Sequence, residues 1–142
     1  MEWEDLADER VVCPAPGANE YTSRMLRSAW DSVVEARSAY LAAQWERADS
    51  QIRTAICIAT EALVGYHGWR LSKTCEFDTA RRIGAEYFGS RLTEPMFERA
   101  CILRGMLPLG REIDDSEARE VRRSVAASSE YVALVESFTY RP

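Results

Sequence analysis

The segment from residue 52 to residue 70 is the one long stretch of this sequence that is apolar around most of a helical circumference. Thr54, Thr60 and Glu61 interrupt it, so it is too polar for a membrane span, which needs about 20 mostly apolar residues. A helix that is apolar on most sides needs other helices to cover it, which predicts a central helix inside an all-α bundle. Its apolar positions recur at helical spacing: Ile52, Ile56, Ala59, Leu63 and Tyr66, widened by Ala55, Ile58 and Ala62.

Four other segments show the helical period of hydrophobic residues. Together with the central helix they predict an all-α, up-and-down bundle of about five helices. No alternation of polar and apolar residues typical of a β-strand competes with this prediction. The four segments run from about 22 to 44, over 77–88, from 93 to 107, and from 114 or 116 to about 138.

Glycine and proline residues predict where these helices begin and end. Gly65 and Gly68 are expected to end the central helix. Thr93 is expected to begin the fourth helix, because Pro95 would then lie in the first turn, where proline is tolerated. Pro108 is expected to break that helix. The aromatic residues expected in the core are Trp30, Tyr40, Phe77, Phe97 and Phe138.

Residues 1–19 are expected to form an acidic N-terminal arm ahead of a single helical-bundle domain over residues 20–142. Residues 1–20 hold six acidic residues against Arg10 alone, and Pro14, Pro16 and Gly17 prohibit a continuous helix. Two alternatives remain open for the arm: it is loose, or its apolar residues pack on the bundle or on a second subunit.

Composition narrows the classes of function. A net charge of −5 gives no concentrated basic surface, so nucleic-acid binding is possible but not supported by charge. The four cysteines contain no Cys-x-x-Cys pair and the chain has one histidine, so neither a metal site nor a cofactor is expected. An N-terminus rich in acids is unlike a signal peptide, which predicts a cytoplasmic protein with no membrane partner.

The densest group of polar residues lies at the break after the fourth helix, and a second group lies at the end of the central helix. Binding residues gather at such interruptions, although an ion-pair network with helix caps explains them as well. Asp114 lies three residues before Glu117, a spacing typical of a helix-capping arrangement. The candidate ligand- or partner-binding residues are Arg104, Arg111, Glu112, Asp114, Asp115, Arg70 and His67.

Over about residues 22–138 the sequence resembles the HEPN family of small helical bundles. The resemblance rests on an alanine-rich helical hairpin, on the segment Gly68-Trp69-Arg70, on the polar residues from Arg104 to Glu112, and on the alanine-bearing last helix. Active members of that family carry an arginine followed, after four to six residues, by a histidine, and use the pair for metal-independent RNA cleavage from a dimer interface.

The histidine of that signature is absent here, because neither Arg104 nor Arg111 is followed by one. Without an imidazole to move the proton of a ribose 2′-hydroxyl, ribonuclease activity is not expected. The resemblance instead implies a non-catalytic homodimer that binds a protein or a nucleotide, such as the partner of a minimal nucleotidyltransferase in a toxin–antitoxin-like pair. The alternatives are a divergent metal-independent ribonuclease and an unrelated structural or adaptor bundle.

Overall fold

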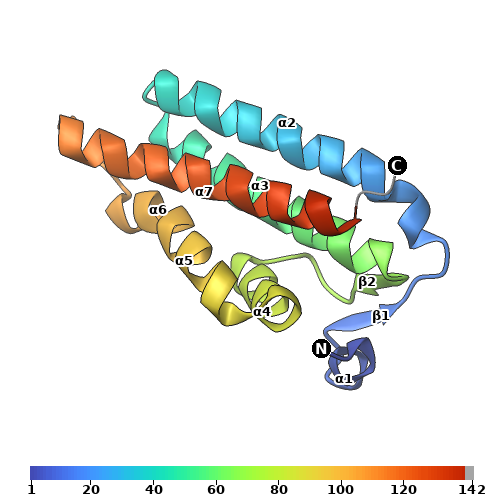
Figure 1. Cartoon of the computed structure of the whole chain (residues 1–142). Helices are drawn as coiled ribbons and strands as arrows, with labels where there is room; N and C mark the ends of the chain where they lie inside the picture. Colours follow the sequence, from blue (N-terminus) through green and yellow to red (C-terminus); the bar gives the residue numbers. More distant parts are fainter. Residues whose placement is uncertain (140–142) are drawn as a thin grey trace.

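The computed structural model describes residues 1–139 and is almost entirely helical. Two long helices, α2 (Thr22–Leu41) and α3 (Trp45–Tyr66), form an antiparallel hairpin, and the last helix, α7 (Asp115–Thr139), packs on both (Figure 1). Between α3 and α7 the chain returns along the bundle through α4 (Phe77–Phe88), α5 (Ser90–Ala100) and α6 (Ile102–Met106). The all-α, up-and-down bundle predicted from the sequence is therefore confirmed.

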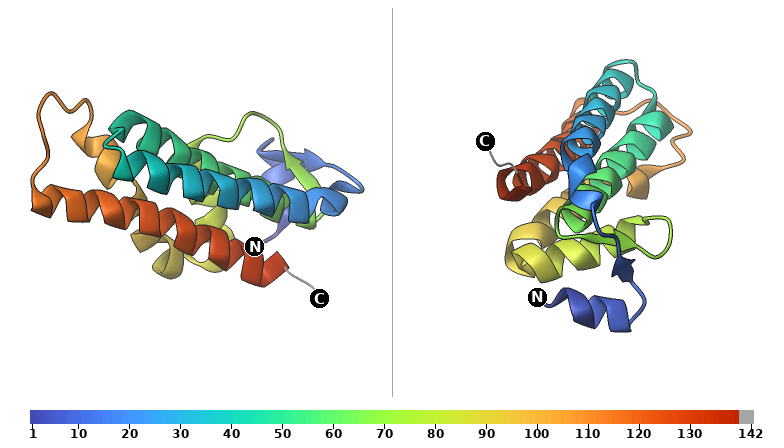
Figure 2. Two further views of the ribbon diagram at one scale, coloured as in Figure 1. Left: turned by 90° about the horizontal axis from the view of Figure 1, so that it is seen from above. Right: turned by 90° about the vertical axis from the view of Figure 1, so that its right-hand side faces the viewer.

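Helix α3 is the central helix that the hydrophobic period predicted. It contacts α2, α4, α6 and α7, and Ile52, Ile56 and Leu63 are almost fully buried. The end-on view shows α4 and α5 on the far side of α3 and α7 from α2 (Figure 2). The helix starts earlier than expected, at Trp45, and Gly65 lies inside it. Gly68, with a φ of 83°, is the glycine that follows its end.

The N-terminal segment is ordered and packs on the bundle. Residues Trp3–Asp8 form the short helix α1, and strand β1 (Val12–Pro14) pairs antiparallel with strand β2 (Trp69–Leu71). Leu6 and Val12 are buried, 1% and 2% exposed, and anchor this segment. The sequence predicted no strand, because three-residue strands are too short to show an alternating pattern.

The start of α5 corrects a second prediction. The helix begins at Ser90, so Pro95 lies within it rather than in its first turn. The backbone N–H groups of Leu92 and Thr93 both donate to the carbonyl of Gly89, and the buried Thr93 hydroxyl does the same. Gly89, with a φ of 95°, supplies the sharp corner after α4, so the next helix can start at once. The break at Pro108 is confirmed, because α6 ends at Met106, but the single helix expected over 93–107 is divided at Cys101 into α5 and α6.

Of the five aromatic residues predicted to lie in the core, only Phe97 is fully buried. Trp30, Tyr40 and Phe77 are partly buried and pack against the core, and Phe138 is 54% exposed. Tyr131, which was not among the five, is fully buried, and its hydroxyl lies 2.8 Å from Thr60 Oγ1. Helix α7 faces α2 and α3 on one side and α5 on the other, so its buried face is wider than a single stripe.

Candidate functional site

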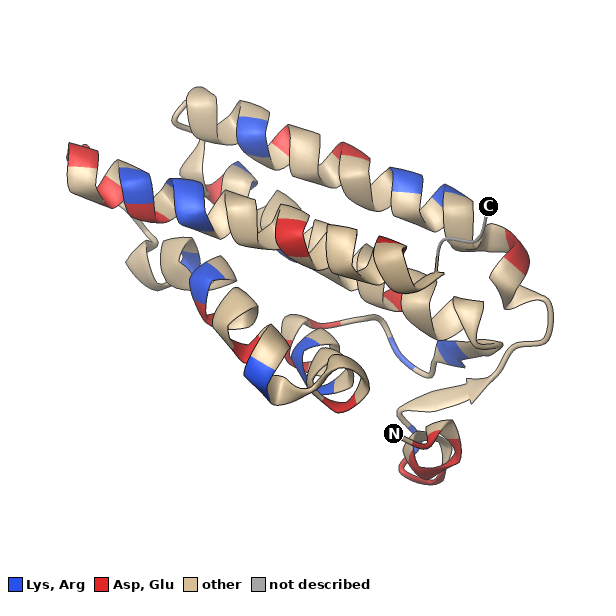
Figure 3. Ribbon diagram, viewed as in Figure 1, with Lys and Arg blue, Asp and Glu red and all other residues tan. Residues whose placement is uncertain are grey.

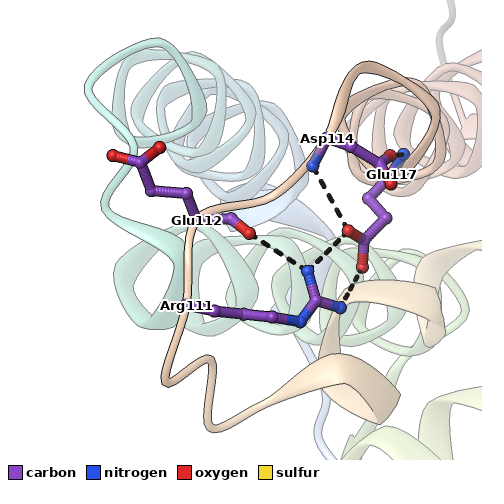
Figure 4. A network of polar contacts seen from close by, with 4 residues as sticks. All are labelled: Arg111, Glu112, Asp114 and Glu117. Atoms are coloured by element: carbon purple, nitrogen blue, oxygen red, sulfur yellow. Dashed lines mark hydrogen bonds and ion pairs between the residues drawn. The ribbon is translucent and has the colours of Figure 1, made fainter.

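The structure shows what each sequence-predicted residue contacts at the break between α6 and α7. The Arg111 guanidinium donates to both carboxylate oxygens of Glu117, at 2.7 and 2.5 Å, and to the carbonyl oxygen of Glu112 (Figure 4). Asp114 Oδ1 accepts from the Glu117 N–H at 2.8 Å, while Glu117 accepts from the Asp114 N–H at 3.2 Å. This reciprocal pair is a capping box at the start of α7, which confirms the capping arrangement expected there.

The hydrogen bonds of this group therefore run among its own members, Arg111, Asp114 and Glu117. The Arg111 hydrogen bonds, followed by the Asp114 N–H, lower the pKa of Glu117 to about 2. Asp115 is the first residue of α7, where a negative charge suits the helix dipole, and the Glu112 side chain points away from Arg111 (Figure 4). The group is a helix start supported by an ion pair, in which the Arg111 side chain stays 62% exposed.

This geometry predicts a pH effect at the start of α7. Because the pKa of Glu117 is lowered from 4.5 to about 2, the ion pair stabilises the fold above pH 4.5 and is lost as the pH falls through about 2. An NMR titration of the Glu117 carboxyl carbon is expected to show the low midpoint, and Arg111→Gln is expected to raise it toward 4.5. A midpoint that Arg111→Gln leaves unchanged would contradict the assignment.

His67 and Arg70 lie at the far end of the bundle. Helix α3 spans 22 residues, about 33 Å, from the corner near Leu107 and Leu109 to the turn that holds His67. Figure 1 shows β2, which contains Arg70, at this end and α6 at the other. Within one chain, His67 cannot reach the arginines near the α6–α7 break.

The His67 ring belongs to an aromatic cluster. Its Nε2 lies 2.8 Å from the Tyr87 hydroxyl, and its ring centroid lies 5.3 Å from that of Trp3 and 5.1 Å from that of Tyr66. Partial burial lowers the pKa of the imidazole. These contacts give His67 a structural role in seating α1 against the end of α3.

A groove between α3 and the segment leading into α4 is the site that sequence reasoning missed, apart from Arg104. We call it the α3–α4 groove. Its volume is about 760 Å³, within the range of ligand pockets, and it is partly open. Arg53 and Arg104 line it, and Arg104 forms no ion pair among residues 1–139. The remaining lining residues are Ser50, Thr54, Cys57, Ile58, Glu61, Thr74, Cys75, Glu76, Phe77, Asp78 and Cys101.

Charge is unevenly placed along the groove. Arg53 and Glu61 are eight residues apart on α3, so about 12 Å of helix separates the basic position from the acidic one. Burial raises the pKa of the Glu61 carboxyl. Arg53 Nε donates to Oδ2 of the buried Asp49 at 3.1 Å, which fixes the guanidinium against the helix. The groove can therefore hold an anionic group at one end and a hydrogen-bond donor at the other.

The two arginines of α4 form ion pairs with acidic residues. Arg81 pairs with Glu94, and Arg82 pairs with Glu9 and Glu86. Basic and acidic residues alternate over most helices, while acidic residues gather on α1 (Figure 3). Arg81 and Arg82 thus belong to an ion-paired surface.

Comparisons with protein-family models, with curated proteins and with solved structures found no match. The part of the chain that the structure describes contains no group of three or more His, Cys, Asp or Glu side chains placed to hold a metal ion. Over residues 1–139 no helix is long and apolar enough to cross a bilayer.

Proposed function

We propose that this protein is a non-catalytic binding module of HEPN type, working as a homodimer, that takes a nucleotide-bearing ligand in the α3–α4 groove. The observation that carries the proposal is the distribution of the basic groups. Arg111 is already bound by Glu117, and His67 lies a helix length away, whereas Arg104 faces an open groove without an ion pair among the described residues. Groups for binding are available there, and groups for proton transfer to ribose are not assembled within one chain.

A nucleotide fits the charge pattern of the groove. Its phosphate is an anion that arginine guanidinium groups bind through charge-assisted hydrogen bonds. An exocyclic amino group of the base can donate a hydrogen bond, which a carboxylate such as that of Glu61 can accept. Glu76 and Asp78 make the opposite wall acidic, so the groove favours a ligand whose negative charge is confined to the Arg53–Arg104 end. A nucleotidyltransferase partner, which the HEPN resemblance implies, handles ligands of this chemistry.

Removing the Arg104 guanidinium tests the proposed ligand. A charge-assisted hydrogen bond contributes about 1.5–3 kcal/mol, so Arg104→Gln is expected to weaken binding of ATP at least about tenfold in isothermal titration calorimetry. Arg91→Gln is the matched control, because Arg91 is an exposed arginine at the start of α5, outside the groove. No heat of binding with the unaltered chain, or an equal loss in both variants, would overturn the nucleotide proposal.

The exposed apolar surface of α2 supports the homodimer. Val34 and Leu41 are 61% and 73% exposed and lie two turns apart on the same side of the helix. Leu41 also lines a groove of about 530 Å³ between α2 and α7, together with Tyr40, Val125 and Ala126 and with the polar Arg37, Arg122 and Ser129. A second copy of the chain would cover this surface, since large exposed apolar patches mark interaction sites.

Sedimentation velocity tests the homodimer. We expect a concentration-dependent dimer of the unaltered chain, and Leu41→Glu is expected to weaken it at least about tenfold, because a charge would be buried in the interface. Leu92→Glu is the matched control on α5, where Leu92 is 46% exposed. A strict monomer at all concentrations would count against the proposal.

Incubation with RNA tests the alternative function. RNA cleavage without divalent metal by the unaltered chain, and not by Arg111→Ala, would favour a ribonuclease instead.

A further inference from the structure

Three of the four cysteines line the α3–α4 groove: Cys57, Cys75 and Cys101. Cys57 lies on α3, and Cys75 lies in the segment that joins β2 to α4, so two different walls of the groove each supply a thiol. The Cys57 thiol donates to the backbone carbonyl of Cys75 at an Sγ···O distance of 3.5 Å, and the Cys75 thiol donates to the backbone carbonyl of Glu76 at the same distance. Both side chains are partly exposed, so a small reagent in the groove can reach them.

The two thiols differ in character. The neighbouring Cys75 side chain lowers the pKa of the Cys57 thiol, against the opposing effects of burial and of the Glu61 charge. Arg53 also lowers the pKa of Cys57, and Glu76 raises it. The neighbouring Cys57 side chain, followed by burial, raises the pKa of the Cys75 thiol. Thiolate is the reactive form of cysteine, so these directions favour Cys57 as the attacking thiol and Cys75, beside it in the groove, as the thiol that resolves its oxidation.

We propose that Cys57 and Cys75 form a redox site in which hydrogen peroxide converts the two neighbouring thiols into an intramolecular disulfide across the groove. In the first step the Cys57 sulfur attacks one peroxide oxygen: the S–O bond forms, the O–O bond breaks, and the other oxygen leaves and takes a proton as water. The product is a sulfenic acid. In the second step the Cys75 sulfur attacks the Cys57 sulfur, the S–S bond forms, the S–O bond breaks, and a second water leaves. The two thiols lose two electrons, and hydrogen peroxide is reduced to two waters.

The disulfide would tie the segment before α4 to the middle of α3. It closes a loop between residues 18 positions apart and fixes one wall of the groove relative to the other. Such a bond stabilises a fold chiefly by constraining the unfolded chain, so the oxidised protein is expected to melt several degrees above the reduced one. This inference rests on the thiol geometry and does not depend on the proposed nucleotide.

Peptide mapping tests the site directly, because trypsin leaves each cysteine of interest on a separate peptide. Cleavage after arginine and lysine places Cys57 in residues 54–70, Cys75 in 74–81, Cys101 in 100–104 and Cys13 in 11–24. The full chain is treated with a few equivalents of hydrogen peroxide, blocked with an alkylating reagent, digested and analysed by mass spectrometry. The expected product is a chain that has lost two hydrogens and has no disulfide to a second chain, with peptides 54–70 and 74–81 linked.

Two serine variants complete the test. Cys101→Ser, which removes the third thiol of the groove, is expected to leave the linked peptide unchanged. Cys75→Ser is expected to abolish it and to trap Cys57 as a sulfenic acid that reacts with dimedone. A disulfide that maps to Cys13 or Cys101, a disulfide between chains, or thiols that stay reduced under these conditions would each overturn the proposal.

Discussion

Replacing Phe97 with alanine is expected to lower the free energy of unfolding by about 3–5 kcal/mol, the cost of removing a buried phenyl ring from a core that cannot close the cavity. Phe97 is fully buried, and its ring meets those of Phe77 and Tyr131 edge to face, at centroid distances of 5.2 and 5.1 Å. A Cβ atom built on Gly84 would lie 3.3 Å from the Phe97 ring. Since α4, α5 and α7 all contribute to this contact, the loss would weaken the packing between three helices.

Phe138→Ala is the matched control for this prediction. The same side chain is removed, but Phe138 is 54% exposed and contacts Tyr87 and Phe88 at the surface, so a cost of about 1 kcal/mol or less is expected. Urea unfolding gives the free energies of unfolding of both variants, which can be compared directly when the dependence on urea concentration is the same for both. Equal costs for Phe97 and Phe138 would mean that the aromatic core has been assigned wrongly.

Arg53→Ala is expected to cause the second large loss in the free energy of unfolding. Asp49 is 4% exposed, its Oδ2 accepts from Arg53 Nε, and its Oδ1 has no hydrogen-bond partner among residues 1–139. Removing the guanidinium leaves a buried carboxylate without a counter-charge, at an expected cost of about 2–3 kcal/mol. Arg53 is itself partly exposed, with 39% of its side-chain surface accessible, which keeps this figure below that of a fully buried pair.

Two further variants separate the buried charge from the loss of arginine itself. Arg47→Ala removes an arginine whose ion pair with Glu35 is exposed on both sides, and a cost below about 1 kcal/mol is expected. Combining Arg53→Leu with Asp49→Leu is expected to recover most of the lost stability, because the orphaned carboxylate is gone. A double variant as unstable as Arg53→Ala would show that the ion pair is not the cause.

The sequence predicted the bundle because most of its helices carry a regular apolar stripe. The central helix from Ile52 onward, the helix over 77–88 and the break at Pro108 all follow from local rules of period, capping and proline geometry. The β1–β2 pair does not, because Val12 and Leu71 meet only through the tertiary fold. Tyr131 was missed for a similar reason: its burial depends on α5 and α7 packing together.

In the candidate site, too, some features follow from local sequence rules and others depend on the tertiary fold. The capping box of Asp114 and Glu117 is local, and its spacing is visible in the sequence. The α3–α4 groove is not local, since Arg53, Cys75 and Arg104 come from three separate segments that the fold brings to one cavity. Each of these residues, taken alone, looks like an ordinary residue of a helix or connector. Only Arg104 was chosen from the sequence, because it lies near a helix break.

The strand pair has a practical bearing on experiments with this chain. β2 leads directly into the segment that carries Cys75 and forms one wall of the α3–α4 groove, and the pairing of β2 with β1 holds the start of that segment in place. Purification tags or deletions ahead of Val12 would disturb this strand pairing, and the reactivity of the Cys75 thiol, some 60 residues downstream, is expected to change with them. Affinity handles are therefore better placed after the last helix.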